Sequence, residues 1–252
     1  MIRSICIRRV LLVLFGLTVS ALAGADWQIS VNKEMQKDEA VRLALQDLKT
    51  TAAGYGIDFE ITDDQQPVKD QAILVGGPDR NRQVANLADR QAYHVEVPAD
   101  TQGYQIRTII DSGKKVMLVS GGSVIGDVYG LYWIWDRIRV NKTLPEINVT
   151  RIPALKTRMS LAWGRSPFGG GSEADMHQAL RYSGNWVSGK AILDLVPWNS
   201  EPEKSLNKQN REETRKLIAY AHSLHIKYFC FANEFTYHPT LLAENNARLS
   251  PC

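Results

Sequence analysis

The sequence predicts an α/β protein, with an N-terminal α/β sandwich-like domain followed by the first three βα units of an incomplete (β/α)8 barrel. Two features of the pattern support this prediction. Up to about residue 153, short apolar runs of strand type alternate with helical patterns and one hairpin pattern. From residue 155 the chain changes to a regular repeat of strand, loop and helix, which is typical of parallel strands joined by helical crossovers.

The first 25 residues have the pattern of a secretory signal peptide. Arg3, Arg8 and Arg9 precede an almost wholly apolar run over 10–23. That run is shorter than the roughly 20 residues of a membrane span, and Ala21-Leu22-Ala23 matches the small-residue cleavage pattern. We therefore expect a secreted or periplasmic protein from which this segment is removed. An uncleaved anchor helix is the alternative.

Composition excludes several other classes. A hydrophobic content of 44% with 23% charged residues is typical of a globular chain. The 30 basic and 27 acidic residues become equal once the three arginines of the leader are set aside, which gives no argument for nucleic acid or a membrane surface as partner. Three cysteines are too few for a disulfide framework. His222 and His225 lie three apart with no third ligand nearby, so we expect no metal.

The N-terminal domain is expected over 26–153. Its first strand, 27–31, alternates apolar and polar side chains as a half-buried strand does. The segment 37–53 then places apolar residues on one helical face, has acids in its first turn and ends at glycines. Further strands are expected at 57–61, 72–75, 104–110 and 115–120, with a short helix at 81–90 and a hairpin turn at Asp111-Ser112-Gly113.

The clearest element of this domain is a helix over 124–139. One face of it collects the large apolar side chains of Val124, Val128, Leu131, Trp135 and Ile138. Gly126 and Gly130 also lie four residues apart in it. Because glycine within a helix costs roughly 1 kcal/mol relative to alanine, the pair indicates close packing against a sheet. The segment 141–153 is interpreted as a connector, since Pro145 and Pro153 interrupt regular structure.

Two glycine pairs raise the question of a phosphate site. Gly76-Gly77 follows an expected strand, and Gly121-Gly122 precedes the 124–139 helix, so each could cradle an anion. Neither lies in a G-x-G-x-x-G pattern or beside the lysine and hydroxyl of a P-loop. We therefore favour turn and capping roles for both pairs and expect no cofactor.

The remaining segment, 154–252, is expected to begin a barrel. Its expected strands are 156–163, 190–196 and 226–232, and its expected helices are 173–182 and 210–224. A complete (β/α)8 barrel takes around 250 residues, and about 100 remain here. We therefore interpret the chain as the N-terminal portion of a longer enzyme. A small three-layer domain that closes on itself is the alternative.

Three stretches resemble bacterial glycoside hydrolases. Gly103-Tyr104-Gln105-Ile106 is similar to a "G-Y-x-I" strand, and Tyr129-Gly130-Leu131-Tyr132 is similar to a "Y-G-x-Y" helix. Arg158-Met159, together with Trp163, is similar to the "R-M-x-x-x-W" first barrel strand of the α-glucuronidases of glycoside hydrolase family 67. The family 20 hexosaminidases share the general two-part arrangement. The resemblance covers about residues 60–240, and the pattern departs from the α-glucuronidases directly after Trp163.

The resemblance implies a glycoside hydrolase that acts on oligosaccharides derived from plant or other polysaccharides. Such enzymes use two carboxylates at the carboxyl ends of barrel strands. In the families named, these lie on the fourth strand and later, so the catalytic residues are unknown and are expected beyond residue 252. Glu234, which ends the third strand, is a weaker candidate, with a loop residue as the alternative. The chain by itself is expected to be inactive.

Sugar-binding residues are expected at or beyond the strand ends, where aromatic faces pack on sugar rings and polar groups bind hydroxyls. The candidates are Arg158, Trp163, Trp198, Asn199, Asn233, Glu234 and Tyr237. Core packing is the alternative for the tryptophans, and a solvated charge is the alternative for Arg158. A second function from another class also remains open, namely a non-catalytic extracellular domain that binds carbohydrate or protein.

Export gives the first testable prediction. If the leader is cleaved as its pattern indicates, N-terminal sequencing of the exported protein will begin near Gly24 or Asp26. Recovery of a membrane-bound chain that still begins with Met1 would show instead that the segment is an anchor.

Overall fold

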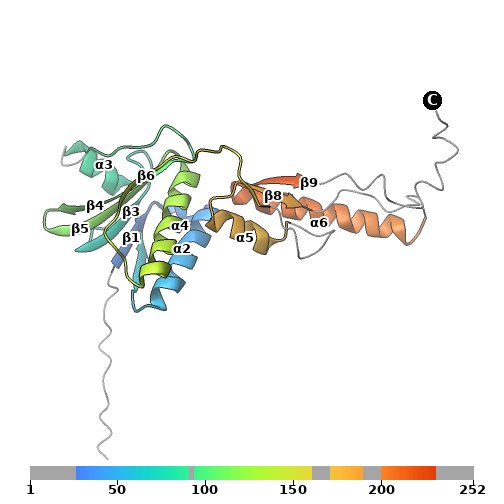
Figure 1. The fold of residues 1–252 in the computed structure, drawn as a ribbon, viewed down its shortest axis with the longest axis horizontal. Coiled ribbons are helices and arrows are strands. Elements are labelled where there is room, and N and C mark those ends of the chain that lie inside the picture. Colours follow the sequence, from blue (N-terminus) through green and yellow to red (C-terminus); the bar gives the residue numbers. More distant parts are fainter. Residues whose placement is uncertain (1–26, 91–93, 161–170, 190–199, 231–252) are drawn as a thin grey trace, which may run out of the picture.

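A six-stranded mixed sheet forms the centre of the N-terminal unit (Figure 1). The computed structural model of the chain describes residues 27–90, 94–160, 171–189 and 200–230. The strands are β1 (Trp27–Val31), β2 (Phe59–Thr62), β3 (Gln71–Val75), β4 (Tyr104–Asp111), β5 (Lys114–Gly121) and β6 (Asn148–Arg151). Their order is β2-β1-β3-β5-β4-β6. The strands β2, β1, β3 and β5 are parallel, whereas β4 runs antiparallel to both β5 and β6.

Helices cover both faces of this sheet. They are α1 (Lys33–Gln36), α2 (Glu39–Ala53), α3 (Arg82–Asp89) and α4 (Val124–Asn141). The helices α2 and α4 pack on one face in the larger hydrophobic core, and α3 packs on the other face in a smaller core. The side chains of Asp38 and Asn81 accept hydrogen bonds from the first-turn N–H groups of α2 and α3, which satisfies donors that a helix start otherwise leaves unpaired.

The glycines of α4 lie where the helix meets the sheet, as predicted. A Cβ on Gly130 would come within 2.6 Å of Val119 Cγ1 in β5, and a Cβ on Gly126 would collide with the backbone oxygen of Gly103. Hydrogen in place of a side chain therefore sets the distance between α4 and the sheet.

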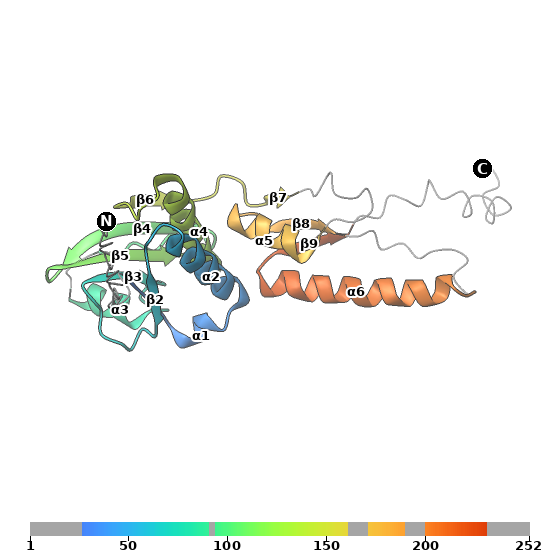
Figure 2. The ribbon, with the colours of Figure 1, turned by 90° about the horizontal axis from the view of Figure 1, so that it is seen from below.

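A second, three-stranded sheet follows. Its strands β7 (Met159–Ser160), β8 (Trp186–Gly189) and β9 (Lys227–Cys230) are parallel and lie in that order. The helix α5 (Glu173–Arg181) connects β7 to β8, and α6 (Glu203–Ser223) connects β8 to β9. The two helices contact each other and their strands. Figures 1 and 2 both show the amino-terminal half of α6 pointing away from the six-stranded sheet. The order β-α-β-α-β is the one predicted, but the predicted second strand, 190–196, lies outside the described residues, and β8 directly precedes it.

Three boundaries differ from the prediction. The connector 141–153 contains a strand, β6, which pairs with β4 although it is mostly exposed. The strand β8 begins at Trp186 rather than at residue 190, because Asn185 hydrogen-bonds to Arg158 and Lys227 on both neighbouring strands. The helix α6 begins at Glu203 rather than at residue 210. Its first two turns hold a single apolar residue, Leu206, and so lack the apolar periodicity that identifies a helix from sequence.

The two sheets share one hydrophobic core. Met176, Ala179 and Leu180 of α5 belong to the same buried cluster as Tyr129 and Tyr132 of α4. The carboxylate of Asp47 in α2 binds Arg181 of α5 through two contacts of 2.8 Å and accepts a hydrogen bond from the Tyr132 hydroxyl at 3.1 Å. The contact of α5 with the N-terminal unit is therefore apolar against α4 and ionic against α2.

The lengths and compositions of the helices show whether any of them could span a membrane. No helix within the described ranges combines the length and apolar character needed to cross a membrane. The leader lies outside these ranges.

The close approach at Gly130 can be tested directly. Gly130→Leu should lower the free energy of unfolding by about 1–3 kcal/mol, because the added side chain overpacks against Val119. Val140→Phe, which likewise adds four carbon atoms at a position of the same helix that is 62% exposed, serves as the matched control and should change stability by less than about 0.5 kcal/mol. Urea denaturation measures both, and equal midpoints for the two variants would show that Gly130 is not at a tight contact.

Candidate functional site

The structure has two sheet edges at which parallel strands end together, and both are candidate sites. In open α/β sheets, ligands bind beyond the carboxyl ends of the strands where the strand order reverses. In the six-stranded sheet this point lies between β1 and β3, because the chain proceeds from β1 outward to β2 and from β3 outward to β5. In the three-stranded sheet, the carboxyl ends of β7, β8 and β9 form the second edge.

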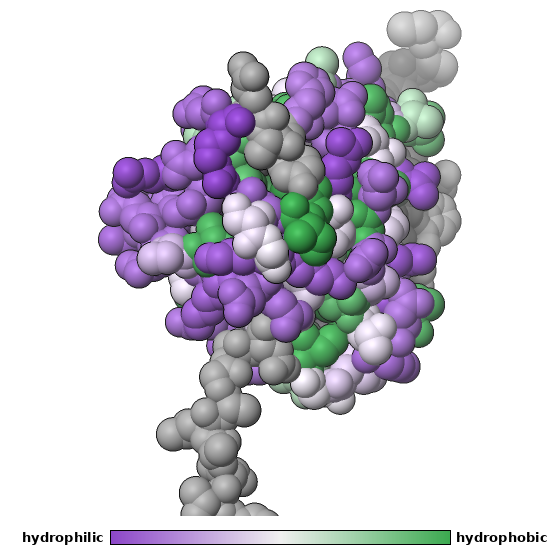
Figure 3. All heavy atoms as spheres, turned by 90° about the vertical axis from the view of Figure 1, so that its left-hand side faces the viewer, coloured by the Kyte–Doolittle hydropathy of each residue, from purple (hydrophilic) through white to green (hydrophobic). Residues whose placement is uncertain are grey.

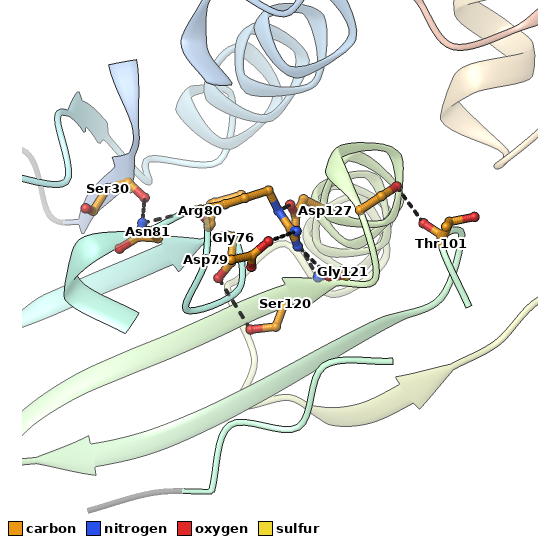
Figure 4. Close-up of polar contacts among 11 residues, drawn as sticks. Ser30, Gly76, Asp79, Arg80, Asn81, Thr101, Ser120, Gly121 and Asp127 are labelled. Atoms are coloured by element: carbon orange, nitrogen blue, oxygen red, sulfur yellow. Dashed lines mark hydrogen bonds and ion pairs between the residues drawn. The ribbon is translucent and has the colours of Figure 1, made fainter. Parts of the chain in front are cut away.

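At the first edge, Asn81 bridges the ends of β1 and β3 (Figure 4). Its amide nitrogen donates to the carbonyl oxygens of Ser30 at 3.0 Å and Val75 at 3.1 Å. Its amide oxygen accepts from the backbone N–H groups of Gln83 and Val84 at the start of α3. Asn81 is 1% exposed, so the position where the strand order reverses is occupied by the protein's own side chain.

Beside Asn81, a buried ion pair closes the end of β5 (Figure 4). Arg80 Nε lies 3.0 Å from Asp127 Oδ2, and Arg80 Nη2 donates to the carbonyl oxygen of Gly121 at 2.6 Å. Asp127 Oδ1 accepts from the Gly121 N–H at 2.5 Å. Burial raises the pKa of Asp127 to about 7, although the Arg80 charge and the Gly121 hydrogen bond oppose that rise. The Asp127 carboxylate, in the first turn of α4, thus accepts a hydrogen bond from Gly121 at the end of β5 and fixes the turn between the two elements.

The sequence favoured turn and capping roles for the two glycine pairs; the structure shows a turn conformation at Gly76 and close packing at Gly121 and Gly122, while Ser123 is the N-cap residue of α4. Gly76 has φ +116°, a conformation that side-chain-bearing residues rarely adopt. A Cβ on Gly121 would collide with the backbone of Gly126 and Asp127, and a Cβ on Gly122 would collide with the backbone oxygen of Asp100. The start of α4 is therefore filled by protein atoms, and the first edge is a packing junction.

Figure 3 shows one face of the described part of this unit. The end of the molecule opposite α6 is mainly hydrophilic, with hydrophobic side chains in small separate groups (Figure 3). A large contiguous apolar patch, which would indicate a binding face, is not seen in this view.

The second edge is where the sequence places its sugar-binding residues. The described parts of its strands reach Ser160, Gly189 and Cys230. Trp163, Trp198, Asn199, Asn233, Glu234 and Tyr237 come after these strand ends, and all six lie outside the described residues. The sequence prediction for them remains a prediction.

Arg158 is the one candidate that the structure describes, and it lies at the amino end of β7. Its guanidinium donates to the carbonyl oxygens of Ser183 and Leu155 at 2.6 Å and to Gln102 Oε1 at 2.7 Å. It also lies 5.5 Å from the ring centroid of Tyr129. These contacts join β7 to the N-terminal unit, and they give no support to a sugar-binding role for Arg158.

A contact that the sequence analysis missed lies at the carboxyl end of β8. The ring of Tyr228 in β9 packs directly over Gly189, where a Cβ would overlap the ring, and next to Gly171, whose added Cβ would lie 2.8 Å from it. Gly171 has φ +76° and directly precedes Ser172, the capping residue of α5. The segment before α5 therefore returns to the end of β8. A glycine at the end of a strand is the sequence signal for such a close approach.

Four aromatic rings in the described ranges have a cation over one face. Arg137 lies over Trp133, Arg139 over Trp135, Lys142 over Tyr55 and Lys227 over Trp186, at 4.4–5.2 Å from the ring centroids. A sugar ring needs an open aromatic face, so these four faces are not open to one. Tyr182, which is 64% exposed, is not among them.

The two faces of the three-stranded sheet differ. Val187 is buried in the core shared with α5. Neighbouring residues on a strand point to opposite faces, so Met159, Ser188 and Phe229 lie on the face away from the helices. Met159 is 45% exposed and Phe229 is 42% exposed. The described part of the chain thus leaves one apolar sheet face partly uncovered.

Comparison with solved structures finds a similar fold in part of a glycoside hydrolase. A GH138 enzyme targeting pectin rhamnogalacturonan II matches 80% of this chain with a TM-score of 0.52 and 14% sequence identity. The structure of CpGH84D matches 81% of it with a TM-score of 0.49 and 13% identity. The chain spans 24% and 33% of the lengths of these two proteins. No family model and no curated protein matches the sequence.

The likeness to the GH138 enzyme shows that this chain has a glycoside-hydrolase-like α/β fold. It does not single out family 67, which the sequence motifs suggested. At this sequence identity, the likeness extends to the fold alone.

The buried ion pair provides a prediction with a pH dependence. Arg80→Leu leaves Asp127 buried without its partner, so the free energy of unfolding should fall by about 3–5 kcal/mol at pH 8. A carboxyl whose folded pKa is raised loses stability as pH rises through that pKa. The loss in the variant should therefore be smaller at pH 5, where Asp127 holds a proton.

Arg82→Leu is the matched control, because Arg82 is the neighbouring arginine and is exposed. It should change stability by less than about 0.5 kcal/mol at either pH. Chemical denaturation at the two pH values measures both variants. A loss for Arg80→Leu that is the same at pH 5 and pH 8 would contradict the role given to Asp127.

Proposed function

We propose that this chain is the N-terminal part of a secreted glycoside hydrolase that acts on oligosaccharides derived from plant or other polysaccharides. One observation supports this most strongly. Two successive β-α-β units, with both helices in contact with each other, directly follow an α/β unit that packs against them. This is the arrangement expected where a (β/α)8 barrel begins.

The partly exposed sheet face supports a barrel. Apolar side chains such as Met159 and Phe229 are half exposed on the face away from α5 and α6. In a (β/α)8 barrel, the helices lie outside and the other face of the sheet lines a packed interior. Further parallel strands beside β9 would bury this face and extend the sheet toward a closed barrel.

The N-terminal unit would then act as the platform of the catalytic site. The side chains of Arg158 and Asn185 hold the amino ends of β7 and β8 to Gln102, while Arg181 anchors α5 to α2. With the amino ends fixed, the direction of the carboxyl ends is fixed too. Residues on loops beyond a rigid sheet can then be placed accurately.

The chemistry follows from the position of the predicted residues. Glycoside hydrolysis needs an acid on the leaving oxygen and a second carboxylate as nucleophile or base, about 5–10 Å apart. Glu234, directly after Asn233, is the acid that this chain offers near the end of β9. Trp163, Trp198 and Tyr237 would supply the apolar contacts to sugar rings. The motifs that resemble family 67 motivate a test with substrates of the α-glucuronidase type, although the pattern departs from that family directly after Trp163.

The predicted inactivity of the chain alone is tested by an assay of glycosidase turnover. We expect the purified 252-residue chain to give no turnover of aryl glycosides or glucuronoxylan fragments, because one strand-end acid does not complete the pair. The Glu234→Gln variant is the control. Turnover that disappears in Glu234→Gln would show that the chain holds a working catalytic acid, and would overturn the prediction of inactivity while supporting the enzyme class.

The DNA downstream of codon 252 decides between the enzyme and the binding domain. We expect an open reading frame with further βα units and paired acids. A stop codon with no such sequence in any frame would contradict the glycoside hydrolase proposal and favour a non-catalytic domain that binds carbohydrate or protein.

A further inference from the structure

The contact between the two units contains a histidine–carboxylate pair that connects three elements. His225 Nε2 lies 2.7 Å from Asp38 Oδ2. The other oxygen of Asp38 accepts from the backbone N–H groups of Ala40 at 3.0 Å and Val41 at 3.2 Å, at the start of α2. One carboxylate therefore caps α2 and binds the residue that links α6 to β9.

His225 lies in the turn between α6 and β9, so its bond to Asp38 can affect the position of β9. His225 has φ +57° and its N–H donates to the carbonyl oxygen of His222 in the last turn of α6. The next residue, Ile226, is 1% exposed and belongs to the shared core. The turn at His225 therefore sets the direction in which β9 leaves α6.

The charge on His225 depends on Asp38. The hydrogen bond to Asp38 and its negative charge raise the pKa of His225, and partial burial opposes that rise. Partial burial alone would raise the pKa of Asp38, but the bond and charge of His225 and the N–H groups of α2 outweigh it, so that pKa is lowered. Both shifts favour the ionised pair.

A second histidine in the same contact region, His177, has its pKa shifted in the opposite direction, downward. His177 Nε2 in α5 lies 2.6 Å from the Tyr220 hydroxyl in α6. Partial burial, followed by the charge of Arg181, lowers the pKa of His177, against the opposing charges of Asp47, Glu173 and Glu39. The packed structure thus favours neutral His177 beside charged His225.

We propose that the packing of α6 against α2 and α5 is a pH-sensitive joint, in which protonated His225 holds the α6–β9 turn to the start of α2 and protonation of His177 loosens α5 from α6. The contribution of His225 is complete below its unfolded value of 6.5 and is lost as pH rises through its higher folded pKa. The contribution of His177 is complete above 6.5 and is lost as pH falls through its lower folded pKa. The joint is therefore tightest close to pH 6.5.

The experiment is hydrogen exchange of the full chain between pH 5 and pH 8.5, with rates corrected for the intrinsic effect of pH. In the wild type, protection of the β9 amides should fall roughly three- to tenfold between pH 6.5 and pH 8.5. Asp38→Asn removes the charge but keeps an equally good cap for α2, and should abolish this fall. His225→Asn, which suits the same positive φ, should do the same.

His222→Asn is the matched control, because His222 lies three residues earlier at the same exposed helix end, and it should retain the wild-type profile. Below pH 6.5, we expect the protection of the α5 amides in the wild type to decline as His177 is protonated. The variant His177→Gln should remove this decline. Asp127 also titrates near neutral pH, but its effect is common to all these proteins and cancels in the comparison. A wild-type profile retained in Asp38→Asn, or lost equally in His222→Asn, would overturn the proposal.

Discussion

The burial of α4 on more than one side is the constraint on which the rest of the structure depends. A surface helix has one apolar stripe, whereas a helix that is apolar all round is buried. In α4, buried residues run almost without interruption from Gly126 to Trp135. Gly130 brings one side against β5, while Tyr129 and Tyr132 join the core that includes α5. One helix thus holds the two sheets together.

Polar groups around this core determine the orientation of the contact. Asp47 is engaged by Arg181 of α5 and by Tyr132 of α4. Since the Asp47 and Arg181 side chains are 23% and 35% exposed, their attraction is screened by water and contributes modestly to stability. Its bidentate geometry nevertheless specifies how α5 lies on α2. Apolar burial supplies most of the stability of the contact, and the polar groups select one arrangement of it.

The sequence predicted elements well where periodicity is strong. The strands β1, β3, β4 and β5 and the helix α4 were located within a few residues, because apolar side chains and glycines mark both their faces and their ends. The strand β6 was missed, because it is an exposed edge whose pairing with β4 leaves no apolar pattern. The start of α6 was missed for the same reason.

The candidate site was harder to predict than the fold. Arg158 was selected because a strand carries it, but its acceptors Ser183 and Gln102 come from distant parts of the chain, and sequence periodicity gives no information on such contacts. The same holds for the Arg80–Asp127 pair, which joins residues 47 positions apart. Helix and strand periodicity is local, whereas these sites are defined by the tertiary fold.

The central claim is that the three-stranded sheet depends on α4 and α2 for its stability. Native-state hydrogen exchange of Leu180→Asp tests this most directly, because Leu180 is fully buried in the shared core and a charge there cannot be paired. Tyr182→Asp, at a position that is 64% exposed, is the control. We predict that Leu180→Asp removes protection from α5, β8 and β9 while β1, β3 and β5 remain protected. Full protection of β8 and β9 in this variant would contradict the claim.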